Sequence, residues 1–448
     1  MIGEDRGRAL PSYRVETWGC QMNVLDGQRM AGQLESQGLR RAGEGEEAGV
    51  ILLNTCSVRE KAEAKVFSAL GTLARRKQEN PDLVIGVTGC VAQVSGEEIL
   101  ERAPWVDFVA GTGQVESIGD LVARARRDRR QALELELPEE DPVYQFRQIA
   151  RDSAFQAYVT VIEGCDQYCT FCIVPFTRGR ERCRRSTEIL AELDHLARAG
   201  YTEVTLLGQT VNAYRDPETG SGLGSLLRLA AAVPGLSRVR FLTSHPALVD
   251  DDLVAALAEG GKLAPYFHLP AQSGSDRILN RMKRRYTAAE YVETIGRIRK
   301  HIPEIAISTD FIVGFPGESE DDFEATLELV RTVRFSNVFG FRYSRRPGTA
   351  AARWGSQAEV PDEVSAGRLA RLLDLQAVLQ QETNGALVGR EFEILVEGED
   401  REGQSRGRTP CNRIVHVEDG GGKLRAGDYA AVRITRGLPN SLIGRMAG

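Results

Sequence analysis

The sequence has no long hydrophobic run, few aromatic residues and no strong excess of charge of either sign. In 448 residues, no apolar stretch approaches the roughly 20 residues of a membrane-spanning helix. Aromatic residues make up 6%, against 42% hydrophobic and 27% charged residues, ordinary values for a globular chain. The first six residues, MIGEDR, are polar, so we expect no secretion signal and a cytoplasmic protein. At roughly 150 residues per domain, the length indicates about three domains.

The net charge of −6 does not indicate a nucleic-acid-binding protein. Residues 1–150 carry 19 Lys and Arg against 24 Asp and Glu, whereas residues 385–448 carry 10 against 9, a net charge of +1. Because the field of the whole molecule repels phosphate, any contact with RNA must come from local basic patches.

Cysteine is also scarce, and the positions of the cysteines matter more than their number. The eight cysteines are Cys20, Cys56, Cys90, Cys165, Cys169, Cys172, Cys183 and Cys411. The cytosol keeps thiols reduced, so we do not expect disulfides. Three cysteines lie within eight residues, and three others are separated by 36 and 34 residues.

The first segment, residues 11–127, alternates between strand and helix patterns. The expected strands lie at 13–18, 50–54, 83–88 and 106–110, and the expected helices at 26–37 and 59–78. This alternation predicts a doubly wound parallel sheet. Cys20, Cys56 and Cys90 each come just after a strand, where open α/β sheets bind their ligands.

From residue 155 the strand and helix patterns alternate for six further units. The expected strands lie at 157–163, 203–208, 237–242, 265–269, 304–313 and 335–343. The expected helices lie at 187–199, 224–232, 249–259, 287–300, 320–332 and 361–383. Residues 151–382 are therefore predicted to form an incomplete (β/α)6 barrel. The charged segment 128–150, with its two prolines, is predicted to be a linker.

The last segment, residues 383–448, changes to patterns of period two. Residues 392–397, 414–417 and 429–434 alternate between apolar and polar, and three glycines at 420–422 separate two of these runs. This pattern predicts a small antiparallel β-barrel.

The most specific motif is the loop after the first barrel strand, where Cys165, Cys169 and Cys172 have the spacing C-x3-C-x2-C. Three thiolates can hold a [4Fe–4S] cluster that leaves one iron open to a small molecule. A zinc site with a fourth ligand elsewhere, or three inert buried cysteines, are the alternatives.

This loop resembles that of the radical S-adenosylmethionine (SAM) enzymes. The resemblance implies that the open iron binds the amino and carboxylate groups of SAM. Reductive cleavage of SAM then yields a 5′-deoxyadenosyl radical. Phe171 matches the aromatic residue that lies against the adenine of SAM in this superfamily.

Several polar residues at the ends of the barrel strands are candidates for binding SAM. They are Gln209 after the second strand, Gln272 and Ser273 after the fourth, and Thr309 in the fifth. Small and polar residues at these positions let the backbone approach a ligand closely.

Cys20, Cys56 and Cys90 are expected to converge at one edge of the first sheet and to hold a second, auxiliary [4Fe–4S] cluster. Three inert buried cysteines are the alternative. The residues around them resemble the methylthiotransferases of the radical SAM superfamily. The matching stretches are GCQMN at 19–23, NTCSVREKA at 54–62, GCVAQ at 89–93, EGC at 163–165, PFTRGR at 175–180, TSHP at 243–246 and QSGSD at 272–276. The resemblance runs from about residue 13 to 444, so residues 383–448 correspond to the family's RNA-binding TRAM domain.

The resemblance favours the tRNA branch of the family, which makes 2-methylthio-N6-isopentenyladenosine at position 37, beside the anticodon. It implies two SAM, two [4Fe–4S] clusters, a low-potential electron donor and a sulfur donor. The sister branches act on threonylcarbamoyladenosine or on a ribosomal protein, and residues 21–23 and 57–60 favour the isopentenyl branch. Thr210 departs from the asparagine expected there. A non-catalytic iron–sulfur protein that binds RNA is the alternative from another class.

Arginines near the barrel mouth are the candidates for contact with tRNA. They are Arg178, Arg180, Arg284, Arg285 and Arg345. Because they follow barrel strands, we expect them to form a basic entrance for an RNA loop. Cys183 and Cys411 fit neither cysteine triad, and among the histidines only His245 is an active-site candidate. No feature requires a second subunit, so we expect a monomer.

Overall fold

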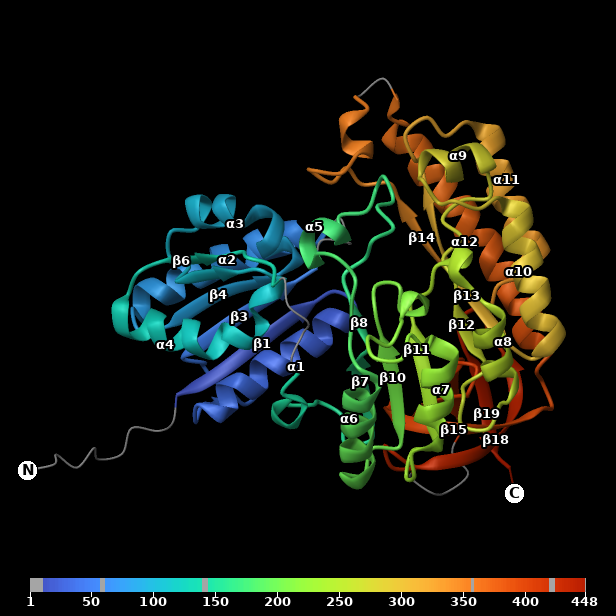
Figure 1. The fold of residues 1–448 in the computed structure, drawn as a ribbon, viewed down its shortest axis with the longest axis horizontal. Coiled ribbons are helices and arrows are strands. Elements are labelled where there is room, and N and C mark those ends of the chain that lie inside the picture. The colour runs from blue at the N-terminus through green and yellow to red at the C-terminus, as the bar shows by residue number, and fades with distance from the viewer. Residues whose placement is uncertain (1–10, 57–60, 139–143, 356–357, 419–423, 448) are drawn as a thin grey trace, which may run out of the picture. The chain divides into compact units, whose positions relative to one another are not determined.

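The computed structural model describes residues 11–56, 61–138, 144–355, 358–418 and 424–447 (Figure 1). They belong to two units. The first comprises the chain up to residue 153 together with 158–167 and 173–184, and the second comprises 154–157, 168–172 and the chain from 185 onward. Residues 57–60 and 420–422, which contributed to the sequence predictions, lie outside the described residues. No helix in the described ranges is long and apolar enough to cross a membrane.

The first unit is built on a parallel sheet with the order β2-β1-β3-β4-β5-β6. Its strands are β1 (Ser12–Trp18), β2 (Arg40–Arg41), β3 (Val50–Thr55), β4 (Val84–Gly89), β5 (Phe108–Ala110) and β6 (Ala132–Glu134). Every residue of β3 and β4 is buried. Their continuous apolar runs are typical of central parallel strands covered on both faces.

Helices cover both faces of this sheet. They are α1 (Gln21–Ser36), α2 (Lys61–Glu79), α3 (Cys90–Arg102) and α4 (Ile118–Asp128), with a 3-10 turn at Thr112–Ser117. One apolar core includes Leu52 with residues of α1 and α4, and the other includes Ile51 with residues of α2 and α3. The predicted doubly wound parallel sheet is confirmed.

The segment predicted as a linker, 128–150, is structured along part of its length. It contributes β6 to the sheet and a 3-10 turn at Phe146–Gln148. The N–H of Ala150 donates to the carbonyl of Gln28 at 3.1 Å. A Cβ on Gly32 would lie 1.5 Å from the carbonyl oxygen of Gln148, so only glycine fits where this segment crosses α1. The first unit also includes β8 (Ile162–Glu163), α5 (Val174–Arg178) and β9 (Arg182–Cys183).

The six barrel strands predicted from the sequence are present. They are β7 (Gln156–Thr160), β10 (Glu203–Leu207), β11 (Arg238–Leu242), β12 (Tyr266–His268), β13 (Ala306–Val313) and β14 (Asn337–Arg342). They form two sheets of three, β11-β10-β7 and β12-β13-β14, joined by a bridge between Val239 and Leu263. The pairs β10–β11, β12–β13 and β13–β14 are parallel.

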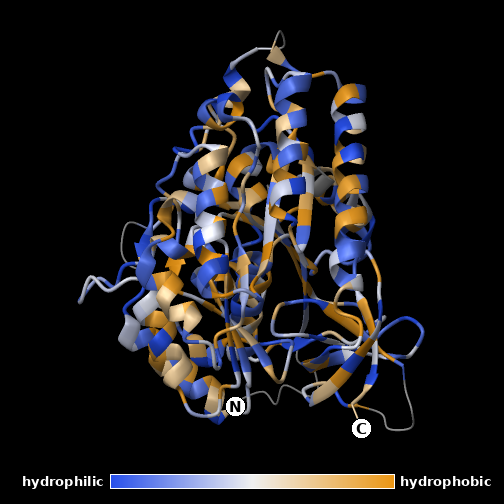
Figure 2. Ribbon diagram, turned by 90° about the vertical axis from the view of Figure 1, so that its right-hand side faces the viewer, coloured by the Kyte–Doolittle hydropathy of each residue, from blue (hydrophilic) through white to orange (hydrophobic). Residues whose placement is uncertain are grey.

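The helices of the second unit match the predicted ranges closely, and α9 adds a short one. They are α6 (Ser186–Arg198), α7 (Leu223–Ala232), α8 (Asp251–Ala258), α9 (Asp276–Arg281), α10 (Ala288–His301), α11 (Glu320–Val333) and α12 (Asp362–Gly385). Figure 2 shows hydrophilic and hydrophobic residues interspersed along the helices, as expected of helices with one face in the core and one in solvent.

The C-terminal residues form a closed five-stranded barrel, as predicted. Its strands are β15 (Glu391–Glu399), β16 (Ser405–Arg408), β17 (Ile414–Val417), β18 (Tyr429–Gly437) and β19 (Leu442–Met446). The expectation of purely antiparallel pairing needs one correction, because β17 and β19 are parallel. Strands β16 and β19 were not predicted, since both are short and neither alternates between apolar and polar residues.

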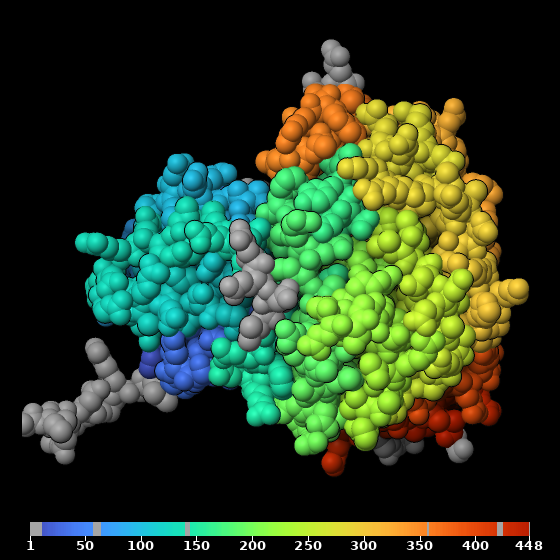
Figure 3. All heavy atoms as spheres, in the orientation of Figure 1, coloured from blue at the N-terminus to red at the C-terminus, as the bar shows by residue number. Residues whose placement is uncertain are grey.

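This C-terminal barrel packs against the amino ends of β10 and β11. Buried Arg240 donates to the carbonyls of Pro410 and Thr409 at 2.8 and 2.9 Å, and its Nε lies 3.1 Å from a carboxylate oxygen of Glu203. Arg238 donates to the carbonyl of Arg408 at 3.2 Å. Figure 3 shows the red C-terminal residues in contact with the yellow-green barrel surface. The C-terminal barrel therefore covers the amino ends of these strands.

Replacing Arg240 by methionine is expected to destabilise the second unit by about 2–4 kcal/mol. The substitution removes the side-chain donor to the half-buried carbonyl of Pro410 and one of the donors to the buried carbonyl of Thr409, which keeps the N–H of Asn412 at 3.0 Å. It also weakens the pairing of buried Glu203. Urea unfolding and protease cleavage near residue 385 measure the loss. Arg433→Met is the matched control, since exposed Arg433 pairs with Glu391 at the surface. It should cost less than about 1 kcal/mol, and equal losses in both variants would contradict the role given to Arg240.

Candidate functional site

The three dispersed cysteines lie at the carboxyl ends of neighbouring strands in the first unit. Cys20 follows β1 and caps α1, Cys56 follows β3, and Cys90 begins α3 directly after β4. Because β1, β3 and β4 are adjacent and parallel, these three strand ends share one edge of the sheet. Cys56 and Cys90 are buried and Cys20 is partly exposed.

Two glycines let the loops close around these thiols. A Cβ on Gly19 would lie 2.5 Å from the Cβ of Cys56, and a Cβ on Gly89 would lie 2.5 Å from the carbonyl oxygen of Thr55. Gly89 also has a φ of +88°, which favours glycine. A larger residue at either position would push the thiols apart.

A buried arginine, Arg178 of α5, stands beside the thiols. It donates to the Asp26 carboxylate, with Nη2 2.6 Å from Oδ2, and its positive charge also acts on the thiol of Cys90. A hydrogen bond from Cys56 and the positive charge of Arg178 lower the pKa of Cys20 to about 6. Burial raises the pKa of Cys90. The site thus combines three cysteine thiols with a buried guanidinium that is paired with a carboxylate.

These residues fit an iron–sulfur cluster. Thiolates are the ligands of such clusters, and the lowered pKa of Cys20 favours the thiolate. In the part of the chain that the structure describes, no three His, Cys, Asp or Glu side chains are arranged around a single metal ion. The thiolates of a [4Fe–4S] cluster each bind a different iron, so they need not surround one point.

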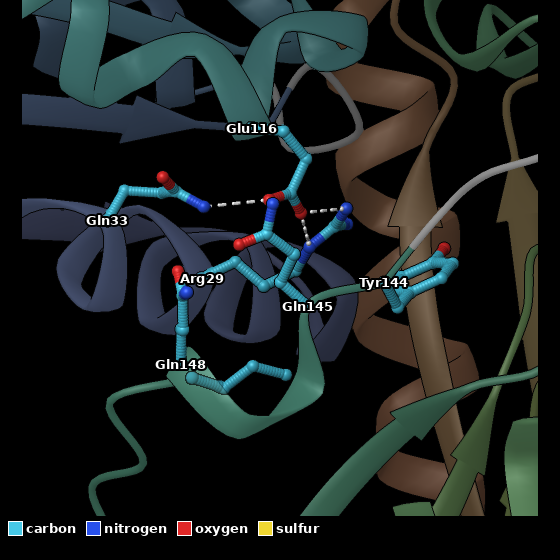
Figure 4. A pocket seen from close by; sticks show the side chains of 7 residues that line it. Arg29, Gln33, Glu116, Tyr144, Gln145 and Gln148 are labelled. Atoms are coloured by element: carbon cyan, nitrogen blue, oxygen red, sulfur yellow. Dashed lines mark hydrogen bonds and ion pairs between the residues drawn. The ribbon is translucent and has the colours of Figure 1, made fainter. Parts of the chain in front are cut away.

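Asp26 links Arg178 to a second buried arginine, Arg29. Arg29 lies 3.5 Å from Asp26 and donates to Glu116 at 2.7 Å. Its guanidinium also lies 4.4 Å from the centre of the Tyr144 ring. Figure 4 shows Arg29 between Glu116 and Tyr144. This network fixes the position of Asp26, and with it the position of Arg178.

The boundary between the two units passes through the three-cysteine loop. Cys165 belongs to the first unit, and its N–H donates to the carbonyl of Gly179 at 3.2 Å. Cys169 and Cys172 belong to the second unit, where the N–H of Cys172 donates to the carbonyl of Cys169 at 3.0 Å. Cys165 and Cys169 are buried and Cys172 is partly exposed.

Arg284 donates a hydrogen bond to one of these thiols. Its Nη1 lies 3.4 Å from the Sγ of Cys169, its Nη2 donates to the carbonyl of Pro270 at 3.0 Å, and its Nε donates to the hydroxyl of Tyr286 at 3.0 Å. The side chain is buried. Its position is therefore fixed by two partners besides the thiol.

The loop after β12 contains a buried polar atom that suits a ligand. The Oε1 of Gln272 has no hydrogen-bond partner among the described residues. Gln272 also has a φ of +70°, and such strain in a non-glycine residue is common at ligand sites. Buried polar atoms are normally satisfied, so a donor such as the amino group of SAM fits here.

The other residues predicted to bind SAM differ in their hydrogen bonds and in their exposure. The hydroxyl of Thr309 accepts from the N–H of Ala271 at 2.8 Å, and that of Ser273 accepts from the N–H of Ser275 at 3.2 Å. Both hydroxyls therefore support the loop itself. Phe171 is partly exposed and meets Phe315 edge to face, with ring centres 6.3 Å apart. Gln209 is partly exposed at the end of β10.

If Cys169 holds a cluster as predicted, replacing Arg284 by glutamine is expected to lower its reduction potential on the order of 100 mV. Loss of the positive donor destabilises the reduced cluster, which carries the extra negative charge. An EPR-monitored redox titration of reconstituted protein measures the shift. Lys283→Gln, which removes an exposed charge next to Arg284, should leave the potential nearly unchanged. An unchanged potential in Arg284→Gln would show that Arg284 does not tune this site.

Comparison with known families agrees with this layout. Residues 12–111 match an uncharacterized protein family, UPF0004, residues 159–330 match the radical SAM superfamily, and residues 385–447 match the TRAM domain. A relative from Cereibacter sphaeroides, named tRNA-2-methylthio-N(6)-dimethylallyladenosine synthase, is 47% identical over 97% of this chain and 98% of its own. A relative with the same name from Mycolicibacterium vanbaalenii is 44% identical over 98% and 89%.

The chain belongs to the family of tRNA-2-methylthio-N6-dimethylallyladenosine synthases. Among solved structures, a radical SAM methyltransferase from Kitasatospora setae, TsrM, matches with a TM-score of 0.54 at 13% identity, covering 76% of this chain and 74% of its own. The cobalamin-dependent SAM radical enzyme OxsB matches with a TM-score of 0.51 at 14% identity, covering 82% and 56%. At these identities the two structures support the fold of this family member and nothing more.

The five arginines expected to contact RNA fall into two groups. Arg180, Arg285 and Arg345 are exposed. Arg178 and Arg284 are buried beside Cys90 and Cys169, so their guanidinium groups are not available to RNA. For these two, the prediction of an RNA contact is replaced by a role next to the cysteines.

Three further residues from the sequence analysis have local partners. His245 is buried, and burial followed by the nearby Arg284 and Arg285 lowers its pKa to about 3, so it is neutral at physiological pH. Its ring nitrogen accepts from the N–H of Ala247. Cys183 lies in β9 opposite Ile162. The sulfur of Cys411 lies 3.2 Å from the hydroxyl of Thr409.

Sequence reasoning missed Asn23, Asp26 and Arg29, which form a polar stripe on the buried side of α1. The spacing of three residues places them on one face of the helix. A buried face that carries an amide, a carboxylate and a guanidinium indicates a polar site. The expected helix at 26–37 began after Asn23, so the sequence did not place the three residues on one face.

Proposed function

We propose that this protein attaches a methylthio group to C2 of N6-isopentenyladenosine at position 37 of tRNA, giving 2-methylthio-N6-isopentenyladenosine. The family, named for this product, is the observation that carries the proposal. The six cysteines of the two triads support it, because each triad follows strand ends where ligands bind in α/β folds.

The reaction requires a reagent that side chains do not supply. C2 of the adenine ring carries an unactivated C–H bond, which no ordinary base or nucleophile breaks. Cys165, Cys169 and Cys172 would hold the cluster that binds SAM, which would supply a 5′-deoxyadenosyl radical for this bond. A second SAM would supply the methyl group. Cys20, Cys56 and Cys90 would hold the auxiliary [4Fe–4S] cluster.

The residues around the triads would position these groups. Arg178 would neutralise charge at the auxiliary site, and Arg284 would do so at the radical site. Gln272 would accept a hydrogen bond from SAM, with Phe171 against its adenine ring. Ser273 and Thr309 would hold the loop that carries Gln272.

The proposed partners are tRNA bearing isopentenyladenosine, a low-potential electron donor and a sulfur donor. The exposed arginines Arg180, Arg285 and Arg345 are proposed to contact the RNA phosphates. The C-terminal barrel, with a net charge of only +1, is proposed to add a few contacts as an anchor. We place the reaction in the cytoplasm and expect a monomer.

Mass spectrometry of tRNA nucleosides from a strain lacking this gene tests the proposal. We expect 2-methylthio-N6-isopentenyladenosine to disappear, N6-isopentenyladenosine to accumulate, and the restored gene to reverse both changes. Loss of the methylthio group from threonylcarbamoyladenosine instead would assign the chain to the sister branch. An unchanged nucleoside profile would favour an iron–sulfur protein that binds RNA without modifying it.

A further inference from the structure

Two phenylalanines on β14 face away from the helix that covers this strand. A Cβ on Gly340 would lie 2.7 Å from Cδ1 of Leu369 in α12, so Gly340 and its face of the strand meet that helix. Phe339 and Phe341 alternate with Gly340 and therefore lie on the opposite face. Their side chains are 44% and 38% exposed.

The neighbours of Phe339 identify this face as the inner wall of the barrel. In the parallel register of β13 and β14, Asp310 lies beside Phe339 and Ile312 lies beside Phe341. The ring of His268 in β12 meets Phe339 edge to face, with ring centres 5.9 Å apart. One sheet thus presents a histidine, a carboxylate and two aromatic rings on the same side.

The polar groups on this wall are held in place by one another. The Nδ1 of His268 lies 2.8 Å from the hydroxyl oxygen of Ser308, and its Nε2 lies 3.5 Å from the Asp310 carboxylate. The hydroxyl of Tyr266 lies 2.6 Å from that of Ser308. The ring of His268 is therefore fixed in orientation where it contacts Phe339.

Strand β13 pairs with the proposed SAM-binding loop along one edge and with the strand of the two phenylalanines along its other edge. The N–H of Gln272 donates to the carbonyl of Asp310 at 2.8 Å, and the N–H of Ile312 donates to the carbonyl of Gln272 at 3.0 Å. Gln272 lies along one edge of β13, and β14 with Phe339 and Phe341 lies along the other edge. A base bound on the phenylalanines would lie at the level of the residue proposed to contact SAM.

We propose that Phe339 and Phe341 bind the isopentenyl-adenine of the tRNA substrate and select for its isopentenyl group. This inference rests on the proposed function. Neighbouring exposed aromatic rings on one sheet face are typical of ligand sites, and unpaired bases in RNA loops stack on such rings. The branched five-carbon group is apolar, so it gains from contact with phenylalanine, whereas the charged threonylcarbamoyl group of the sister substrate does not.

The test compares the affinity of full-length, reconstituted protein for two anticodon stem-loop RNAs that differ only at position 37. One carries N6-isopentenyladenosine and the other adenosine. We expect wild-type protein to bind the first about tenfold more tightly. Phe339→Ala and Phe341→Ala should each reduce this ratio several-fold, and the double variant should bring it close to one. Affinity for SAM should stay unchanged.

Two variants serve as controls. Leu229→Ala removes a side chain that is 44% exposed, like Phe339, but lies on α7, and it should keep the wild-type ratio. Phe341→Leu keeps an apolar side chain and should retain most of the preference. Melting temperatures establish that each variant is folded.

The possible outcomes separate the two claims. A wild-type ratio of one would overturn the substrate assigned in the proposed function. A wild-type preference that survives in the double alanine variant would overturn only the role of the phenylalanines. Equal weakening for both RNAs, or loss of SAM binding, would also overturn that role, because the rings would then serve general RNA or SAM contact.

Discussion

Replacing Arg178 by glutamine is expected to destabilise the first unit by about 3 kcal/mol and to raise the pKa of Cys20 above its value of about 6. Asp26 would keep only its longer contact with Arg29, at 3.5 Å, in a buried site. Cys20 would lose a positive charge that stabilises its thiolate. Urea unfolding of cluster-free protein measures the first effect, and the pH dependence of iodoacetamide labelling measures the second.

The sign of the pH dependence follows from the direction of the Cys20 shift. Because the pKa of Cys20 is lower in the folded protein, the thiolate stabilises the fold above the ordinary thiol pKa. That contribution disappears as the pH falls through about 6. The free energy of unfolding of cluster-free protein should therefore rise as the pH increases from about 6 to the ordinary thiol pKa. The rise should be smaller in Arg178→Gln.

Arg180→Gln is the matched control, because Arg180 lies two residues after Arg178 but is exposed. Its ion pair with Asp166 is long, at 3.8 Å. We expect it to change the unfolding free energy by less than about 1 kcal/mol. If Arg178→Gln unfolded and reacted like Arg180→Gln, the ion pair beside the cysteines would have no measurable role.

Substitutions in the two cysteine triads are expected to have separate and nearly complete effects. Cys165→Ala should abolish formation of 5′-deoxyadenosine, because two thiolates are too few to hold the SAM-binding cluster. Cys56→Ala should still form 5′-deoxyadenosine but should make no methylthiolated RNA, because the auxiliary site is lost. Chromatography of the reaction products measures both.

Cys183→Ala is the control for these experiments, since Cys183 belongs to neither triad. It should retain both activities. Normal methylthiolation by Cys56→Ala would remove the auxiliary cluster from the proposed reaction.

The sequence was most informative where local pattern and chemistry coincide. The apolar runs of β3 and β4 are buried on both faces, so they could be predicted without knowing their neighbours. Predicting these two strands also predicted that Cys56 and Cys90 lie at their carboxyl ends. By contrast, β16 (SRGR) carries no apolar side chain, and β19 (LIGRM) lacks an alternation of apolar and polar residues, so neither showed the period-two pattern of a strand.

The contacts of the buried arginines could not be predicted from a linear pattern. Arg178 lies in a run of basic residues that looks like a solvated surface, yet its partner Asp26 is 152 residues away. Arg284 likewise sits between two exposed basic residues and contacts Cys169, 115 residues away. Whether an arginine in such a run turns inward depends on a partner that only the fold supplies.

The most direct measurement uses reconstituted protein, SAM, a reductant and an anticodon stem-loop RNA with isopentenyladenosine, followed by mass spectrometry of the RNA. We expect the modified base to gain one sulfur and one CH2, as replacement of the C2 hydrogen by a methylthio group requires. 5′-Deoxyadenosine should accumulate in the same reaction. Formation of 5′-deoxyadenosine with no gain of sulfur by the RNA, under conditions where both clusters are shown to be present, would contradict the proposed reaction.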